Sequence, residues 1–178
     1  MIDRIIRAIK LDKLLYREVA QNESYLQESF LIVLAVALLS GLGSAFNANR
    51  PVFTFFAEIS NSIFFGWILW SVIAYFIGTA FFEGNSSVNT LLRTIGYANA
   101  PRLLSFFGFI PCIGWLISLT GAVLSLIAVF IAIREAMQFE TEKAIITALI
   151  GFILFLMTSA AIRIVLTGIS LPFRSIFS

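Results

Sequence analysis

The stretch GYANAPR, Gly96 to Arg102, interrupts a long apolar part of the chain with a glycine, an asparagine, a proline and a full positive charge. Its flanks, VNTLLRTI before it and LLSFFGFIP after it, are rich in apolar residues. Two structures are compatible with this pattern: a surface segment between two membrane crossings, or a helix that is broken inside one crossing. The choice between them determines how many times the chain crosses the membrane and which function it best fits.

The composition predicts an integral membrane protein. Of the 178 residues, 60% are hydrophobic and 12% are charged, whereas a soluble domain carries about 25% charged residues. The chain has no histidine and a single cysteine, Cys112, so it offers no constellation for zinc, haem or a Cys/His nucleophile. A net charge of +2 does not favour nucleic acid as a partner. We therefore expect no enzymatic activity, no cofactor and no metal site.

Uncharged stretches between short charged patches predict an all-α polytopic bundle. A helix needs about 20 apolar residues to cross a bilayer. The uncharged run Leu103–Ile133 is too long for one crossing, and Pro111 and Gly114 predict a turn within it. If Val88–Phe109 is one crossing that contains the break, the bundle has five crossings. The expected division is an arm at 1–28 and a membrane domain at 29–178, with crossings at about 29–48, 61–82, 88–109, 114–133 and 144–166.

A four-crossing arrangement is the alternative, in which 84–102 lies on the surface and 103–113 is re-entrant or buried. Lys and Arg accumulate in cytoplasmic segments, and both arrangements place the basic N-terminal arm in the cytoplasm. The remaining basic residues do not separate the two arrangements. Tryptophan favours membrane interfaces, and five crossings put Trp67, Trp70 and Trp115 near the same outer face. The tryptophans therefore favour five.

The N-terminal arm has its own pattern of apolar residues. They recur at helical spacing up to Lys10, and the apolar stripe then moves to another face. The first stripe consists of Ile2, Ile5, Ile6 and Ile9, and the second of Leu11, Leu14 and Leu15. This pattern predicts two short amphipathic helices on the cytoplasmic leaflet, with docking on a partner as the alternative. A signal peptide is not expected, because the charged segment before the first apolar run is too long.

The broken-helix motif consists of Gly96, Tyr97, Asn99, Pro101 and Arg102. Pro101 removes a backbone donor and clashes with the preceding turn, so carbonyl groups near Tyr97 and Ala98 need other donors. Arg102, Asn99 or water could supply them. A charge inside the hydrocarbon costs about 2.5 kcal/mol or more unless it pairs or snorkels. A helix broken beside a charge resembles the binding sites of transporters. An arginine that snorkels outward beside a structural kink is favoured over such a site, because the expected crossings contain no acidic residue.

Small residues at helical spacing predict close packing along the fourth crossing. The predicted seam consists of Gly114, Ser118, Gly121, Ala122 and Ser125. Packing within one chain is favoured over a contact with another subunit. At the end of this crossing, Arg134 and Glu135 predict a solvated cytoplasmic cap, which could also be a docking surface for a soluble partner.

In their order along the chain, GYANAP, IPCIGW, the long apolar helix ending in AIREA and a following KAI resemble the Yip family. The likeness extends over about residues 8–166, and LDKLLYREV before the first crossing resembles compact prokaryotic members. These are small five-crossing membrane proteins named for their interaction with Ypt/Rab GTPases. The family's Gly-Tyr and later proline correspond to Gly96, Tyr97 and Pro101, its turn to Pro111 and Gly114, and its basic helix end to Arg134.

The resemblance implies five crossings, a cytoplasmic N-terminus and a GYANAPR break that lies in the membrane. The longer N-terminal region of eukaryotic members, with its Tyr-Gly-Pro motif, is absent here, so a small GTPase partner is expected only if the source is eukaryotic. In a prokaryote the protein is expected in the plasma (inner) membrane.

We expect a non-enzymatic scaffold or adaptor that binds other membrane proteins or itself, or that shapes the lipid bilayer. The alternative is a small transporter or channel whose broken third crossing lines a path that favours anions. Acidic residues such as Glu58 are expected in loops, which counts against a proton or cation path.

Overall fold

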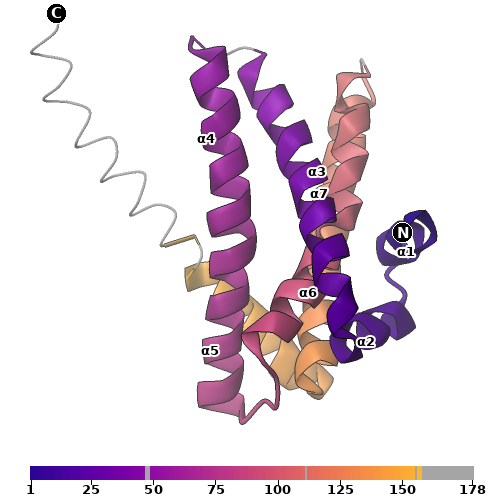
Figure 1. Cartoon of the computed structure of the whole chain (residues 1–178), viewed down its shortest axis with the longest axis vertical. Coiled ribbons are helices and arrows are strands. Elements are labelled where there is room, and N and C mark those ends of the chain that lie inside the picture. Colours follow the sequence, from indigo (N-terminus) through magenta and orange to yellow (C-terminus); the bar gives the residue numbers. More distant parts are fainter. Residues whose placement is uncertain (47–48, 111, 155, 158–178) are drawn as a thin grey trace, which may run out of the picture.

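The computed structural model describes residues 1–46, 49–110, 112–154 and 156–157, and every regular element in these ranges is a helix (Figure 1). The predicted all-α fold is therefore confirmed for the described part of the chain. In chain order the elements are α1 (Ile2–Ile9), α2 (Lys13–Gln21), η1 (Glu23–Tyr25), α3 (Leu26–Ala45), α4 (Pro51–Ile63), η2 (Phe64–Leu69), α5 (Trp70–Phe82), α6 (Val88–Ala98), η3 (Ala100–Phe109), α7 (Gly114–Met137) and a last helix at 141–154.

Successive segments run in opposite directions through an elongated bundle (Figure 1). At one end, the apical end, α3 ends and α4 begins, and η3 ends and α7 begins (Figure 1). At the other end, the basal end, lie the loop between α5 and α6 and the turn between α7 and helix 141–154 (Figure 1). The pair α6 and η3 leads from the basal end to the apical end, and η3 packs along α7.

The helix from Pro51 to Phe82 is continuous and longer than expected. Pro51 occupies its first turn, where the missing N–H is not needed, and Glu83 ends it in the left-handed conformation. At 1.5 Å per residue the helix is about 48 Å long, against about 30 Å for the hydrocarbon core of a bilayer. Residues 51–60 were expected to connect the first two crossings, but they belong to this helix. The expectation that Glu58 lies in a loop is therefore wrong.

Within the described part of the chain, three helices are long and apolar enough to cross a membrane: Glu23–Ala45, Pro51–Phe82 and Gly114–Met137. The protein is therefore a multi-pass membrane protein. The predicted crossing 88–109 is formed by two shorter pieces, α6 and η3, which meet at the GYANAPR stretch. The predicted crossing 144–166 extends beyond the described residues. Five crossings remain a prediction.

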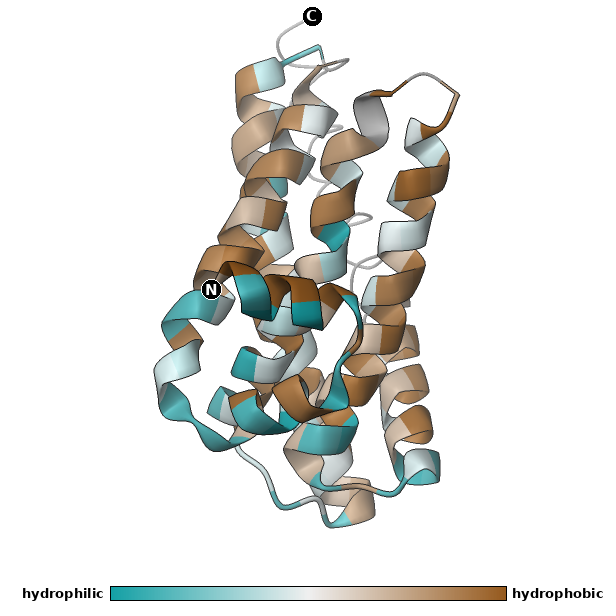
Figure 2. Ribbon diagram, turned by 90° about the vertical axis from the view of Figure 1, so that its right-hand side faces the viewer, coloured by the Kyte–Doolittle hydropathy of each residue, from teal (hydrophilic) through white to brown (hydrophobic). Residues whose placement is uncertain are grey.

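The N-terminal arm forms two short helices that pack against the bundle (Figure 2). In α2, the side chains of Leu15, Tyr16 and Val19 are fully buried against α6 and α7. In α1, Ile5 and Ile9 pack on the core. The other predicted apolar residues of α1, Ile2 and Ile6, are exposed. The arm thus presents one apolar side to the protein and leaves part of its stripe uncovered.

Two of the three tryptophans that were expected near the membrane interface are buried inside the protein. The indole N–H of Trp67 donates a 2.8 Å hydrogen bond to the carbonyl of Leu92 in α6. Trp70 is buried as well, and its ring lies 5.9 Å from that of Phe152, centroid to centroid. Trp67 and Trp70 therefore join helices inside the bundle, and their position near a membrane interface stays a prediction.

Candidate functional site

The GYANAPR stretch is a helix break whose freed carbonyl groups bind donors from within the protein. Helix α6 ends at Ala98, and the tighter helix η3 begins at Ala100 with Pro101 in its first turn. The side-chain amide of Asn99 donates to the carbonyl of Ile95 at 2.9 Å. The hydroxyl of Ser125 on α7 donates to the carbonyl of Ala98 at 2.8 Å, and both residues are buried. Asn99 was one of the expected donors, whereas the donor to Ala98 comes from a distant helix.

Two glycines allow neighbouring backbones to approach the break closely. A Cβ atom at Gly96 would lie 2.6 Å from the Cβ of Ser29 and 3.2 Å from its Cα. A Cβ atom at Gly121 would lie 2.8 Å from the carbonyl oxygen of Pro101. Real Cβ atoms do not approach other heavy atoms so closely. The break is therefore packed between α3 on one side and α7 on the other.

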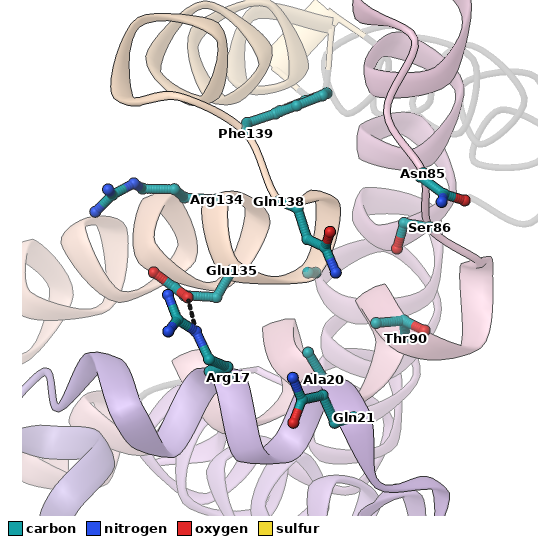
Figure 3. A pocket seen from close by; sticks show the side chains of 11 residues that line it. Arg17, Ala20, Gln21, Asn85, Ser86, Thr90, Arg134, Glu135, Gln138 and Phe139 are labelled. Atoms are coloured by element: carbon teal, nitrogen blue, oxygen red, sulfur yellow. Dashed lines mark hydrogen bonds and ion pairs between the residues drawn. The ribbon is translucent and has the colours of Figure 1, made fainter.

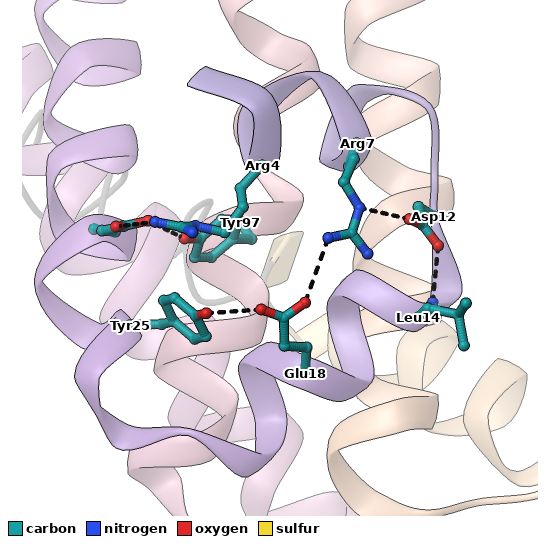
Figure 4. A network of polar contacts seen from close by, with 8 residues as sticks. Arg4, Arg7, Asp12, Leu14, Glu18, Tyr25 and Tyr97 are labelled. Atoms are coloured by element: carbon teal, nitrogen blue, oxygen red, sulfur yellow. Dashed lines mark hydrogen bonds and ion pairs between the residues drawn. The ribbon is translucent and has the colours of Figure 1, made fainter. Parts of the chain in front are cut away.

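Tyr97, the tyrosine of the motif, connects the break to the arm through Glu28 (Figure 4). Its hydroxyl donates to the carboxylate of Glu28, and Arg4 of α1 forms an ion pair with the same carboxylate, with 3.0 Å between Nε and Oε2. The guanidinium of Arg4 also lies over the ring of Tyr25, 5.0 Å from its centroid. The side chain of Tyr97 is fully buried. The first turn of the arm is thus tied to the motif by a charged network.

The same network continues into α2 through Glu18 (Figure 4). Glu18 accepts a hydrogen bond from the hydroxyl of Tyr25 and pairs with Arg7 at 3.3 Å. Arg7 in turn pairs with Asp12, the N-cap of α2, at 2.7 Å. The hydrogen bond from Arg7 lowers the pKa of Asp12, and the hydrogen bond from Tyr25 lowers the pKa of Glu18. Both carboxylates are therefore held in their charged form.

Arg93 of α6 has a role that the sequence did not reveal. Its guanidinium donates to the carbonyl groups of Val19, at 3.3 Å, and Ala20, at 3.0 Å, near the C-terminal end of α2. The side chain is 4% exposed. A cation at this position satisfies carbonyl groups that a helix leaves unpaired at its end. The only sequence signal was the position of Arg93 on α6 shortly before the motif.

Arg102, the charged end of the motif, is half-buried and lies near Asn99. Its guanidinium donates to the side-chain oxygen of Asn99 at 3.4 Å. The acidic residue whose field acts on Arg102 is Glu58 of α4. Glu58 lies in a helix rather than in a connecting loop, and among the described residues it forms no ion pair with Arg102. This charge arrangement was not expected from the sequence.

The predicted seam on α7 is divided between two faces of the helix. Gly114, Gly121 and Ser125 are buried, Ser118 is half-buried and Ala122 is exposed. The buried members face η3 and the end of α6, so they pack within the chain. Of the predicted turn, Gly114 begins α7, while Pro111 lies outside the described residues.

The predicted cap residues lie beside a polar groove at the basal end (Figure 3). Glu135 pairs with Arg17 of α2 at 3.0 Å, whereas the side chain of Arg134 extends away from this pair (Figure 3). The cavity has a volume of about 520 Å³. We call it the basal groove, and its polar lining includes Arg17, Gln21, Asn85, Thr90, Glu135 and Gln138. Among the described residues, no group of three metal-ligating side chains occurs.

One comparison with known proteins gave a match over most of the chain. The family model described as the Yip1 domain matches residues 14–162. This range includes α2, the broken helix, α7 and the described part of the last helix. No curated protein and no solved structure matches the chain.

Proposed function

Because the chain belongs to the Yip1 domain family, we propose that it is a non-enzymatic scaffold or adaptor that binds other membrane proteins. The observation that carries this proposal is the internal packing of the family motif. Gly96, Tyr97 and Asn99 are each engaged with Ser29, Glu28 or the backbone of the same chain. The motif therefore stabilises the fold and positions the arm, and the basal surface that it supports is the part presented to partners.

The basal groove has the chemistry of a protein-binding surface. It combines amide side chains, Gln21, Asn85 and Gln138, with the ion pair between Arg17 and Glu135. The lining therefore offers both hydrogen-bond donors and hydrogen-bond acceptors. Such a surface suits a polar peptide segment better than a single charged metabolite. We propose that a cytoplasmic segment of a partner membrane protein binds here.

The proposed topology has five crossings and a cytoplasmic basal end. Support comes from the path of the chain, since α6 and η3 together lead from the basal end to the apical end (Figure 1). The basic arm also lies toward the basal end, as expected for a cytoplasmic segment. In a prokaryotic source the membrane would be the plasma membrane.

Affinity capture from native membranes tests the adaptor role. Gln21→Trp places a large ring in the basal groove, and Gln27→Trp adds the same ring at an exposed position that does not line it. We expect a stoichiometric partner to be captured by the wild type and by Gln27→Trp, and to be lost with Gln21→Trp. Recovery of the chain alone, or equal recovery of the partner with both variants, would contradict the proposal.

A transporter or channel is the second candidate, favoured by the placement of the charged residue Glu58 within helix α4 rather than in a loop. The π-helical segment η2, which follows α4, adds a local irregularity of the kind found at functional sites. For this candidate we expect a solute flux into liposomes that Arg102→Ala abolishes without unfolding the protein. A flux that is equal in the wild type and the variant would exclude a path along the break.

A further inference from the structure

Helix α1 is a short unit that docks on the flank of the bundle, against α6, η3 and α7 (Figures 1 and 2). Ala8 is fully buried at this contact, and the hydroxyl of Tyr16 donates to its carbonyl at 3.2 Å. Arg4 pairs with Glu28, with 3.0 Å between Nε and Oε2. We call the surface that receives the helix the α1 seat, and its side chains include Tyr16, Tyr25, Glu28 and Tyr97. The family match begins at residue 14, so α1 lies outside the matched range and these seat residues lie inside it.

The hinge that joins α1 to α2 is short and strained. The N–H of Leu11 donates to the carbonyl of Ala8 at 3.0 Å, and the N–H of Asp12 donates to the carbonyl of Arg7 at 3.1 Å. These two bonds form a Schellman motif, which ends a helix with a left-handed residue that is usually glycine. Here that residue is Leu11, with φ of 59°, and its side chain imposes a steric cost that glycine avoids. A short hinge under strain favours exchange of the segment that it holds between two copies of a chain.

Helix α1 also has an apolar edge that the seat does not cover. Its buried side consists of Ile5, Ala8 and Ile9, which pack on the core. Ile2 and Ile6 are 77% and 45% exposed, and residues four apart share one face of a helix. Exchange between two adjacent copies would bring the two α1 helices between the bundles, where this edge is covered.

We propose that α1 exchanges between two copies of this chain in one membrane, so that each α1 occupies the seat of the other copy. The exchanged dimer keeps the contacts of the seat, including the ion pair between Arg4 and Glu28. It also buries Ile2 and Ile6 and releases Leu11 from the left-handed conformation. Three extended residues span about 10 Å, so exchange needs two copies in direct lateral contact, which the position of α1 on the flank permits (Figure 1). No other protein takes part, so this proposal does not rest on the adaptor role.

Cysteine cross-linking of the full-length chain in reconstituted membranes tests the contact between copies. Ile2→Cys is made in a Cys112→Ser background, and Phe46→Cys in the same background is the control, because Phe46 is exposed at the apical end. With a short bifunctional maleimide, we expect Ile2→Cys to give a covalent dimer and Phe46→Cys to give at least tenfold less. A monomer at both positions, or equal cross-linking at the two, would overturn the proposal.

Hinge variants test whether this dimer arises by exchange. Leu11→Gly and Leu11→Ala both remove the leucine side chain, but only glycine removes the cost of the left-handed conformation. In the Ile2→Cys background, the cross-linked fraction should therefore be about fivefold lower with Leu11→Gly than with Leu11→Ala, which corresponds to about 1 kcal/mol. Equal fractions would show that the copies associate without exchange and would refute the proposal.

Charge reversal identifies the helix that is exchanged. Arg4→Glu and Glu28→Arg each place like charges at the seat of their own chain. In a mixture of the two variants, exchange pairs Arg4 of the Glu28→Arg chain with Glu28 of the Arg4→Glu chain, and the two introduced charges also attract. We expect differently tagged chains to co-purify at least tenfold more from membranes that contain both variants than from membranes with either variant alone. Co-purification that is no higher in the mixture would contradict the exchange.

Discussion

Replacing Gly96 by alanine tests whether the GYANAPR break is held by close packing against α3. The new methyl group would lie 2.6 Å from the Cβ of Ser29, 3.2 Å from its Cα and 3.3 Å from its carbonyl oxygen. Two of these three atoms belong to the backbone of α3, so no side-chain rotation can remove the clash. Either α3 or α6 must move as a whole.

The magnitude follows from two opposing effects. Overpacking a well-packed interior costs about 1–3 kcal/mol, and contact with backbone atoms places Gly96→Ala toward the upper end of that range. Alanine in place of glycine gains about 1 kcal/mol of helix propensity. We therefore expect a net loss of about 2 kcal/mol, which lowers the melting temperature of a chain of this size by about 4–8 °C.

The assay is thermal unfolding in detergent, with Gly43→Ala as the matched control. Gly43 lies in α3 and a Cβ atom there would meet nothing within 4 Å, so this variant should be as stable as the wild type or more stable. Adding Ser29→Gly to Gly96→Ala removes the closest contact, and the double variant should be more stable than the sum of the single effects. If Gly96→Ala melts no lower than Gly43→Ala, the reasoning is refuted.

Three further perturbations address the arm and the break. Ser125→Ala leaves the buried carbonyl of Ala98 without its donor and should cost about 1–2 kcal/mol of unfolding free energy, while the exposed Thr120→Ala should cost less than half of that in the same melt. Arg93→Gln removes the charged donor at the end of α2 and should cost about 2 kcal/mol of unfolding free energy. Amide hydrogen exchange in α2 should become faster in this variant. Unchanged protection of α2 would disprove the role of Arg93. The pKa values of Asp12 and Glu18 lie below their ordinary 3.8 and 4.5, so the stability that they provide is present at neutral pH and lost as the pH falls through those lowered values. The melting temperature should therefore fall more steeply below about pH 4 in the wild type than in the double variant Asp12→Asn, Glu18→Gln. If the melting temperatures of the two proteins fall in parallel with pH, the two carboxylates do not provide this stability.

The sequence was sufficient to predict the class of fold and the location of the break. Composition and uncharged runs indicate a helical membrane bundle, and Gly96 and Pro101 mark the point where α6 gives way to η3. The extent of α4 was missed because the charged Glu58 was expected in a connecting loop. In the structure Glu58 lies in a helix that packs against α3. Tertiary contacts outweighed the local polarity.

The partners of the motif could not be predicted, because they come from distant parts of the chain. Ser29, Glu28 and Ser125 are more than 25 residues away from the groups that they contact. Each is a common polar residue in an apolar helix, and nothing in its local sequence distinguishes it from a solvent-facing one. The partner of Trp67, the carbonyl of Leu92, was missed for the same reason, since an amphipathic ring suits a membrane interface and a buried carbonyl equally well.

Labelling of Cys112 tests most directly whether GYANAPR is a break within a crossing rather than a surface loop. This natural cysteine, the single one in the chain, is exposed between η3 and α7 at the apical end. If α6 and η3 form one crossing, a membrane-impermeant maleimide should label Cys112 in intact cells and should not label Glu140→Cys in a Cys112→Ser background. Labelling of Cys112 only after the membrane is opened, with Glu140→Cys labelled in intact cells, would place Cys112 on the cytoplasmic side of α7 and contradict the account.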